Sequence, residues 1–121
     1  MSERFMRFVV QIIQLENQLC RTYCGRHIYG QLFRAGTSSG ANFEEARSGE
    51  SKADFIHKMQ IVLKELRESH YWIKLIIAAQ MISSKQDILK SLLIESQELK
   101  SITAKSVVTA KLKVENSKTN S

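Results

Sequence analysis

The chain has 121 residues, of which 43% are hydrophobic and 25% charged, a composition typical of one soluble domain with a buried core. It contains no proline and only five glycines, which disfavours all-β folds with many turns and favours long helices. The formal net charge is +6, and from Lys100 onward five lysines stand against a single glutamate.

Membrane and secretory segments are not expected. The longest apolar stretch, residues 72–82, includes Lys74 and Gln80 and is shorter than the roughly 20 residues that span a bilayer. The N-terminus lacks the features of a signal peptide, so we expect a cytoplasmic protein. Cys20 and Cys24 are too few for a disulfide framework and are expected to be reduced thiols.

Hydrophobic residues recur every three or four positions in four segments, which predicts four amphipathic helices. Glycine and serine signals between the segments place the helices at about 3–24, 27–47, 51–82 and 85–112. Short connections between them predict an all-α fold, an antiparallel up-down-up-down four-helix bundle that occupies residues 1–113. Residues 114–121 lack periodicity and are expected to form a disordered tail.

The second predicted helix has an unusual centre, Ala35 to Ala41, with two glycines and three hydroxyl residues. Such a segment is a poor helix by itself, so close packing against a neighbouring helix must compensate. The alternative is a loop at residues 36–40.

The third predicted helix has more apolar surface than one partner layer covers. Its core face is expected to carry Phe55, Met59, Val62, Leu66, Ile73 and Ile77. A second apolar set points away from that face and is expected to form contacts between subunits: Ile61, Trp72, Leu75 and Ile76.

A polar stripe on the second and third helices is the main candidate for chemistry or for subunit contacts. It consists of Arg34, Ser38, Asn42, Glu45, Lys58, Glu65 and Glu68. One interpretation is a ligand-binding or catalytic network, which needs an open cleft; the other is a set of ion pairs that fix helix or subunit register.

Signatures of enzymes and metal centres are missing from the sequence. It has no Glu-x-x-His, no glycine-rich nucleotide motif and no nucleophile elbow, and Cys20, Cys24 and His27 lack zinc-site spacing. We therefore predict a protein that is not an enzyme and has no metal or cofactor.

Lysines near the end of the fourth helix are candidate contacts for nucleic acid: Lys100, Lys105, Lys111 and Lys113. Such lysines attract phosphates by releasing counterions. The alternative is that they favour the helix dipole and keep the surface soluble.

Three stretches resemble the bacterial 23S rRNA intervening-sequence protein family: residues 34–46 (RAGTSSGANFEEA), residues 54–68 (DFIHKMQIVLKELRE) and Tyr71-Trp72. The resemblance implies a four-helix subunit in a homo-oligomeric ring, typically a pentamer. It also implies similarity to accessory proteins of diversity-generating retroelements, which bind a reverse transcriptase and nucleic acid. The leading hypothesis is a ring-forming protein with a basic surface for RNA, DNA or a nucleic-acid-handling partner. The alternative is a structural or regulatory protein-interaction module.

Overall fold

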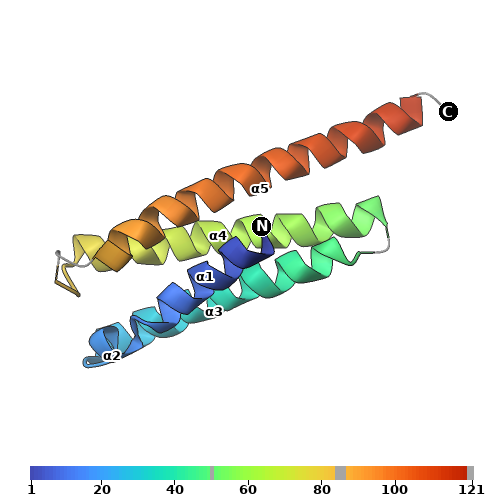
Figure 1. Ribbon diagram of the computed structural model, residues 1–121. Helices are drawn as coiled ribbons and strands as arrows, with labels where there is room; N and C mark the ends of the chain where they lie inside the picture. The colour runs from blue at the N-terminus through green and yellow to red at the C-terminus, as the bar shows by residue number, and fades with distance from the viewer. Residues whose placement is uncertain (50, 84–86, 120–121) are drawn as a thin grey trace.

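The computed structural model describes residues 1–49, 51–83 and 87–119, and these are organised around helices. The helices are α1 (Ser2–Ile13), α2 (Glu16–Leu19), α3 (Tyr23–Arg47), α4 (Lys52–Ala78) and α5 (Asp87–Thr119). In Figure 1, α1 lies against α3 and α5, α3 against α4, and α4 against α5. The fold is therefore the predicted all-α four-helix bundle, and α1 with α2 takes the place of its first helix. None of the described helices combines the length and apolarity needed to cross a membrane.

The first predicted helix, 3–24, is interrupted in the structure. Thr22 is the N-cap of α3, and its Oγ1 accepts a hydrogen bond of 3.0 Å from the amide of Gly25. Gly25 is thus in the first turn of α3 rather than at the end of the first helix. The apolar periodicity hid this break because Leu15, the N-cap of α2, and Leu19, its last residue, are both buried.

The glycine-rich centre of the second predicted helix is helical, so the loop alternative is wrong. A Cβ on Gly36 would lie 2.5 Å from Ile12 Cδ1, and one on Gly40 would lie 3.6 Å from Val9 Cγ2. The missing side chains therefore let α1 approach α3 closely, as the sequence predicted. The hydroxyl of Ser39 donates to the carbonyl of Gly36 at 2.7 Å, so it is satisfied inside the helix.

Helix α4 begins at the predicted cap, where Ser51 Oγ accepts a hydrogen bond of 3.1 Å from the amide of Asp54. Apart from Glu65, its buried positions repeat at alternating steps of three and four residues: Met59, Val62, Leu66, Ser69, Ile73 and Ile76. Such a repeat of 3.5 residues is typical of left-handed helix bundles. The next inward position after Ile73 is therefore Ile76, which is fully buried, while Ile77 is 38% exposed. The predictions for these two residues were reversed.

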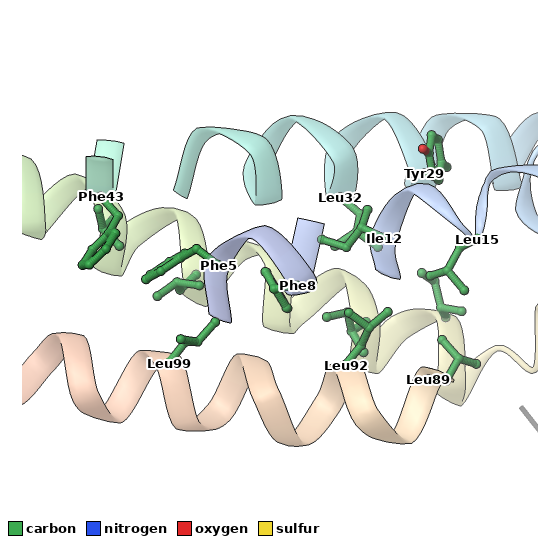
Figure 2. Close-up of a cluster of buried hydrophobic side chains, with 14 of the residues drawn as sticks. Phe5, Phe8, Ile12, Leu15, Tyr29, Leu32, Phe43, Leu89, Leu92 and Leu99 are labelled. Atoms are coloured by element: carbon green, nitrogen blue, oxygen red, sulfur yellow. The ribbon is translucent and has the colours of Figure 1, made fainter. Parts of the chain in front are cut away.

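The core runs along the bundle axis and draws on every long helix. Figure 2 shows Phe5, Phe8, Ile12 and Leu15 facing residues of α3 and α5. The rings of Phe5 and Phe43 stack with centroids 4.6 Å apart and an angle of 17° between their planes. This stacking attaches the start of α1 to the end of α3.

Helix α5 is longer than the sequence predicted. Its last buried residue is Val107, but the helix continues to Thr119 through residues that were expected to be disordered. Residues 108–119 include neither glycine nor proline, so nothing in the sequence ends the helix there. In Figure 1 this C-terminal part of α5 extends away from α4. Part of the predicted cap of this helix, residues 84–86, lies outside the described residues.

Candidate functional site

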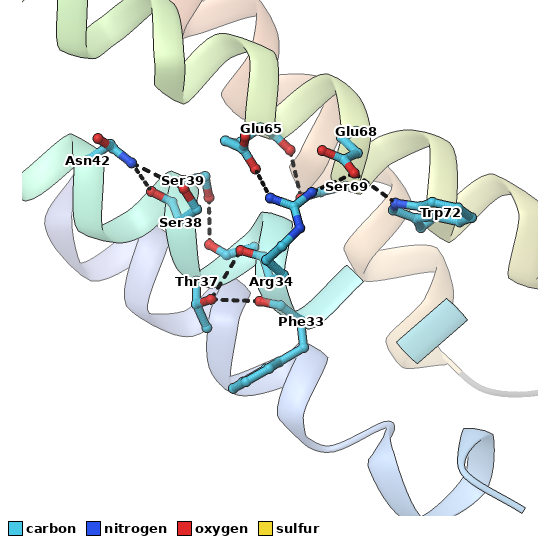
Figure 3. Close-up of polar contacts among 11 residues, drawn as sticks. Phe33, Arg34, Thr37, Ser38, Ser39, Asn42, Glu65, Glu68, Ser69 and Trp72 are labelled. Atoms are coloured by element: carbon cyan, nitrogen blue, oxygen red, sulfur yellow. Dashed lines mark hydrogen bonds and ion pairs between the residues drawn. The ribbon is translucent and has the colours of Figure 1, made fainter. Parts of the chain in front are cut away.

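The polar stripe forms a network of ion pairs between α3 and α4, which Figure 3 shows around Arg34. Arg34 Nη1 lies 3.0 Å from Glu65 Oε2, and Nη2 lies 2.5 Å from Glu68 Oε1. Glu65 is buried, and Glu68 also accepts from Trp72 Nε1 at 3.5 Å. The hydrogen bond from Arg34 lowers the pKa of Glu68, against the effect of desolvation, with smaller contributions from Trp72, the charge of Arg34 and that of Lys64.

The remaining polar residues of the stripe separate into two smaller groups. Lys58 Nζ lies 2.6 Å from Glu45 Oε2, which forms a second ion pair between α3 and α4. Asn42 donates to the carbonyl of Ser38 at 2.9 Å and to its hydroxyl at 3.1 Å, so both stay within α3. The charged members of the stripe are thus paired inside one chain, which is the geometry of a register-fixing network.

We expect the replacement of Arg34 by methionine to raise the pKa of Glu68 toward its ordinary value. Because the folded state lowers this pKa, the ionised carboxylate stabilises the fold above its ordinary pKa, and that stabilisation is lost as pH falls through the lowered value. NMR titration of the side-chain carboxyl carbon measures the change. Arg47→Met is the control, since Arg47 pairs with Glu44 instead. An unchanged pKa of Glu68 in Arg34→Met would contradict the assigned cause.

The predicted apolar interface on α4 is covered in large part by the chain itself. Ile76 is in the core, and Ile61 and Trp72 are half-buried. The Trp72 ring makes edge contacts with His27 at a centroid distance of 6.4 Å and with Tyr71 at 5.1 Å. Less apolar surface therefore remains on this side than the sequence indicated, because the 3.5-residue repeat turns Ile76 inward.

A groove lies at the end of the bundle where α3 ends, α4 begins and α5 extends outward. It has a volume of about 730 Å³, and we call it the basic groove because its charged lining residues are Arg47, Lys52, Lys105 and Lys113. None of the described residues that line it is acidic. Hydroxyl groups and apolar side chains complete the lining: Ser51, Ser106, Thr109, Phe55 and Ile102. A second groove of about 640 Å³ between α4 and α5 shares Lys52.

The four candidate lysines of α5 do not form one patch. Lys105 and Lys113 line the basic groove, whereas Lys100 and Lys111 do not. At about 100° per residue, those two lie more than about 100° around the helix from either groove lysine. The charge of Lys100 instead affects His70 on α4. Burial lowers the pKa of His70, and the positive charges of Lys100 and Lys74 lower it further.

Arg47 and Lys52 were not predicted from the sequence as members of this groove. Each is an isolated cation in the sequence, at the end of α3 and the start of α4. Their grouping with Lys105 and Lys113 follows from the antiparallel topology, which brings the connection between α3 and α4 close to the C-terminal half of α5. Because that topology was predicted, the sequence held enough information to place these two cations near the two lysines.

Metal-binding and thiol chemistry find little support in the structure. Within the ranges 1–49, 51–83 and 87–119, no group of three histidine, cysteine, aspartate or glutamate side chains is arranged to hold a metal ion. Cys20 and Cys24 are free thiols. The basic groove, by contrast, gathers four cations from three helices, and this chemistry suits an anionic partner.

Comparison with known proteins identifies the family. The family model of the 23S rRNA-intervening sequence proteins matches residues 1–105. A crystal structure from Bacteroides thetaiotaomicron VPI-5482, of a protein with unknown function from the S23 ribosomal protein family, is 32% identical, with a TM-score of 0.78 over 88% of this chain and 96% of that chain. No curated protein matches significantly. The family match ends at Lys105, before the last turns of α5. The chain thus belongs to the 23S rRNA-intervening sequence protein family.

Proposed function

We propose that this protein binds the phosphate backbone of nucleic acid in the basic groove and catalyses no reaction. The observation that carries the proposal is the convergence of four cations from three helices on one groove with no acidic residue among its described lining. Such a concentration of like charge attracts polyanions and releases their counterions on binding.

The charges of the groove are mostly available to a ligand. Lys52, Lys105 and Lys113 form no ion pair with another described residue. Arg47 has Glu44 at 3.7 Å, and it also donates to the hydroxyl of Ser2. Uncompensated ammonium groups that share a groove repel each other, so a bound phosphate relieves repulsion as well as adding attraction.

The spacing of the cations favours a polymer over a single phosphate group. Lys105 and Lys113 are eight residues apart on α5, which corresponds to about 12 Å along the helix. Successive phosphates of one strand in a duplex are about 3.4 Å apart along the axis. Two lysines at this spacing are able to contact different phosphates of one strand, which a nucleoside monophosphate does not offer.

Replacement of the two lysines that line the basic groove by glutamine tests this function. We expect Lys105→Gln/Lys113→Gln to weaken binding to labelled RNA and DNA and to make the slope of log affinity against log salt shallower by about 1 for each lysine lost. Fluorescence anisotropy at several salt concentrations measures both effects.

The matched control is Lys100→Gln/Lys111→Gln, which removes the same charge from the same helix but outside the groove. Its salt slope is expected to stay close to that of the wild type. Equal losses in the two double variants would indicate a general charge effect and would contradict the groove. If the wild-type protein binds no nucleic acid at low salt, the proposal fails and the alternative, a structural or regulatory protein-interaction module, takes its place.

Self-association is a second proposal, supported by an apolar stripe on the outer face of α1. Met6, Val10 and Ile13 are spaced by four and three residues and are all exposed. A second copy that covers this stripe would remove apolar surface from water, and closed rings are one solution for head-to-tail contacts. Light scattering gives the number of copies, and a mass of one chain at high concentration would exclude a ring.

A further inference from the structure

An exposed stripe follows α4 along the side opposite the core. Its residues are spaced by alternating steps of three and four, and each is exposed: His57, Gln60, Lys64, Arg67, Tyr71 and Lys74. We call it the α4 stripe. The buried residues of α4 have the same spacing but come two positions later, which places them about 200° around the helix. The α4 stripe begins at the second groove, which His57 and Gln60 line together with Lys52.

The charge of the α4 stripe has one sign. Lys64, Arg67 and Lys74 form no ion pair with another described residue. Glu68 lies four residues after Lys64, but its carboxylate is bound by Arg34 at 2.5 Å. The α4 stripe therefore adds three cations beyond the second groove, and Lys52 lines both that groove and the basic groove.

The far part of the α4 stripe carries an aromatic side chain in a defined position. Tyr71 is 58% exposed, and its ring contacts that of Trp72 edge to face, with centroids 5.1 Å apart and 75° between the planes. Trp72 is in turn held by His27 and by its hydrogen bond to Glu68. Unpaired bases stack on aromatic rings of this kind, which are exposed, held in position by a neighbouring ring and close to cations.

We propose that the α4 stripe is a track for single-stranded nucleic acid, in which Lys64, Arg67 and Lys74 contact phosphates and Tyr71 stacks on an unpaired base. This inference rests on the proposed function, extends it from the basic groove to the exposed face of α4, and specifies single strands as the ligand class. Lys52 and Tyr71 are 19 residues apart, or about 28 Å along α4, which a strand of about eight stacked nucleotides spans. A duplex lacks an unpaired base for Tyr71, so the ring favours single strands.

The test compares a uridine strand of about 12 nucleotides with an RNA duplex of equal length, for the wild type and for Tyr71→Ala, Tyr71→Phe and Tyr23→Ala. Tyr71→Ala is expected to bind the single strand about tenfold more weakly and the duplex as the wild type does. Tyr71→Phe keeps the ring and should retain binding. Tyr23→Ala removes an exposed tyrosine that is outside the α4 stripe and should have no effect.

Trp72 gives a second readout because it is the single tryptophan of the chain and contacts Tyr71. The single strand is expected to change its fluorescence in the wild type and in Tyr71→Phe, but much less in Tyr71→Ala. If Tyr71→Ala binds single strands like the wild type while the Lys105/Lys113 variant does not, the groove stands and the track is wrong. If Tyr71→Ala loses single strand and duplex equally, stacking is also wrong. If the wild type binds neither probe, both proposals fail.

Discussion

Replacement of Phe8 by alanine is expected to lower the free energy of unfolding by about 3–5 kcal/mol, because the ring is fully buried and its removal leaves a cavity. Phe8 lies beside Phe5 and Ile12 in the core that α1 shares with α3 and α5 (Figure 2). A loss of this size is a large part of the stability of a small domain. Urea unfolding followed by circular dichroism measures the change at a fixed protein concentration.

The control for this prediction is Arg7→Ala on the same helix. Arg7 is exposed and lies outside the apolar stripe of α1, so its replacement should change the free energy of unfolding by no more than about 0.5 kcal/mol. Similar small changes in the two variants would mean that α1 is not part of the cooperative core, and the position of α1 in the bundle would be wrong.

Replacement of Gly25 by alanine is expected to lower the free energy of unfolding by about 1–3 kcal/mol or more. A Cβ at this position would lie 1.7 Å from the carbonyl oxygen of Leu19 and 3.0 Å from Thr22 Oγ1. The first of these atoms belongs to the backbone, which cannot rotate away as a side chain does. The connection from α2 to α3 would therefore have to shift, and the Thr22 cap would be strained. Thermal and urea unfolding measure the loss.

Gly30→Ala is the matched control in the same helix, and it should have the opposite sign. A Cβ on Gly30 would meet no atom within 4 Å, and the residue is exposed in the helix interior. Alanine there should stabilise the protein by about 0.5–1 kcal/mol. A destabilising Gly30→Ala would contradict the open position of Gly30, and a Gly25→Ala variant as stable as the wild type would contradict the close contact with Leu19.

Periodicity predicted the fold well because each long helix buries one continuous face. It missed the break before α3, because Thr22 ends the first segment through one hydroxyl while the apolar pattern continues on both sides. It exchanged Ile76 and Ile77 because the expected period of 3.6 differs from the repeat of 3.5 in the bundle. The extension of α5 beyond residue 113, as far as Thr119, was missed because an exposed helix has no apolar face to reveal it.

The candidate site was predicted only in part, because the sequence shows which segments are basic but not which of their side chains meet in the folded protein. Lys105 and Lys113 were identified by their position in a basic segment, but so were Lys100 and Lys111, which face elsewhere. The angular position on α5 separates the two pairs. The sequence pattern also gave no sign that Tyr71 is exposed and supported by Trp72, since this depends on how α3 and α4 pack.

The proposed function requires nucleic acid to bind at the end of the bundle where α3, α4 and α5 meet. Amide NMR spectra recorded while a short RNA strand is added at low salt test it most directly, because each residue reports separately. We expect the largest shift changes at Arg47, Lys52, Lys105 and Lys113 and at their neighbours, further changes along the α4 stripe, and reversal of both by added salt. Changes confined to α1 and α2, or spectra that do not respond to the strand, would contradict it.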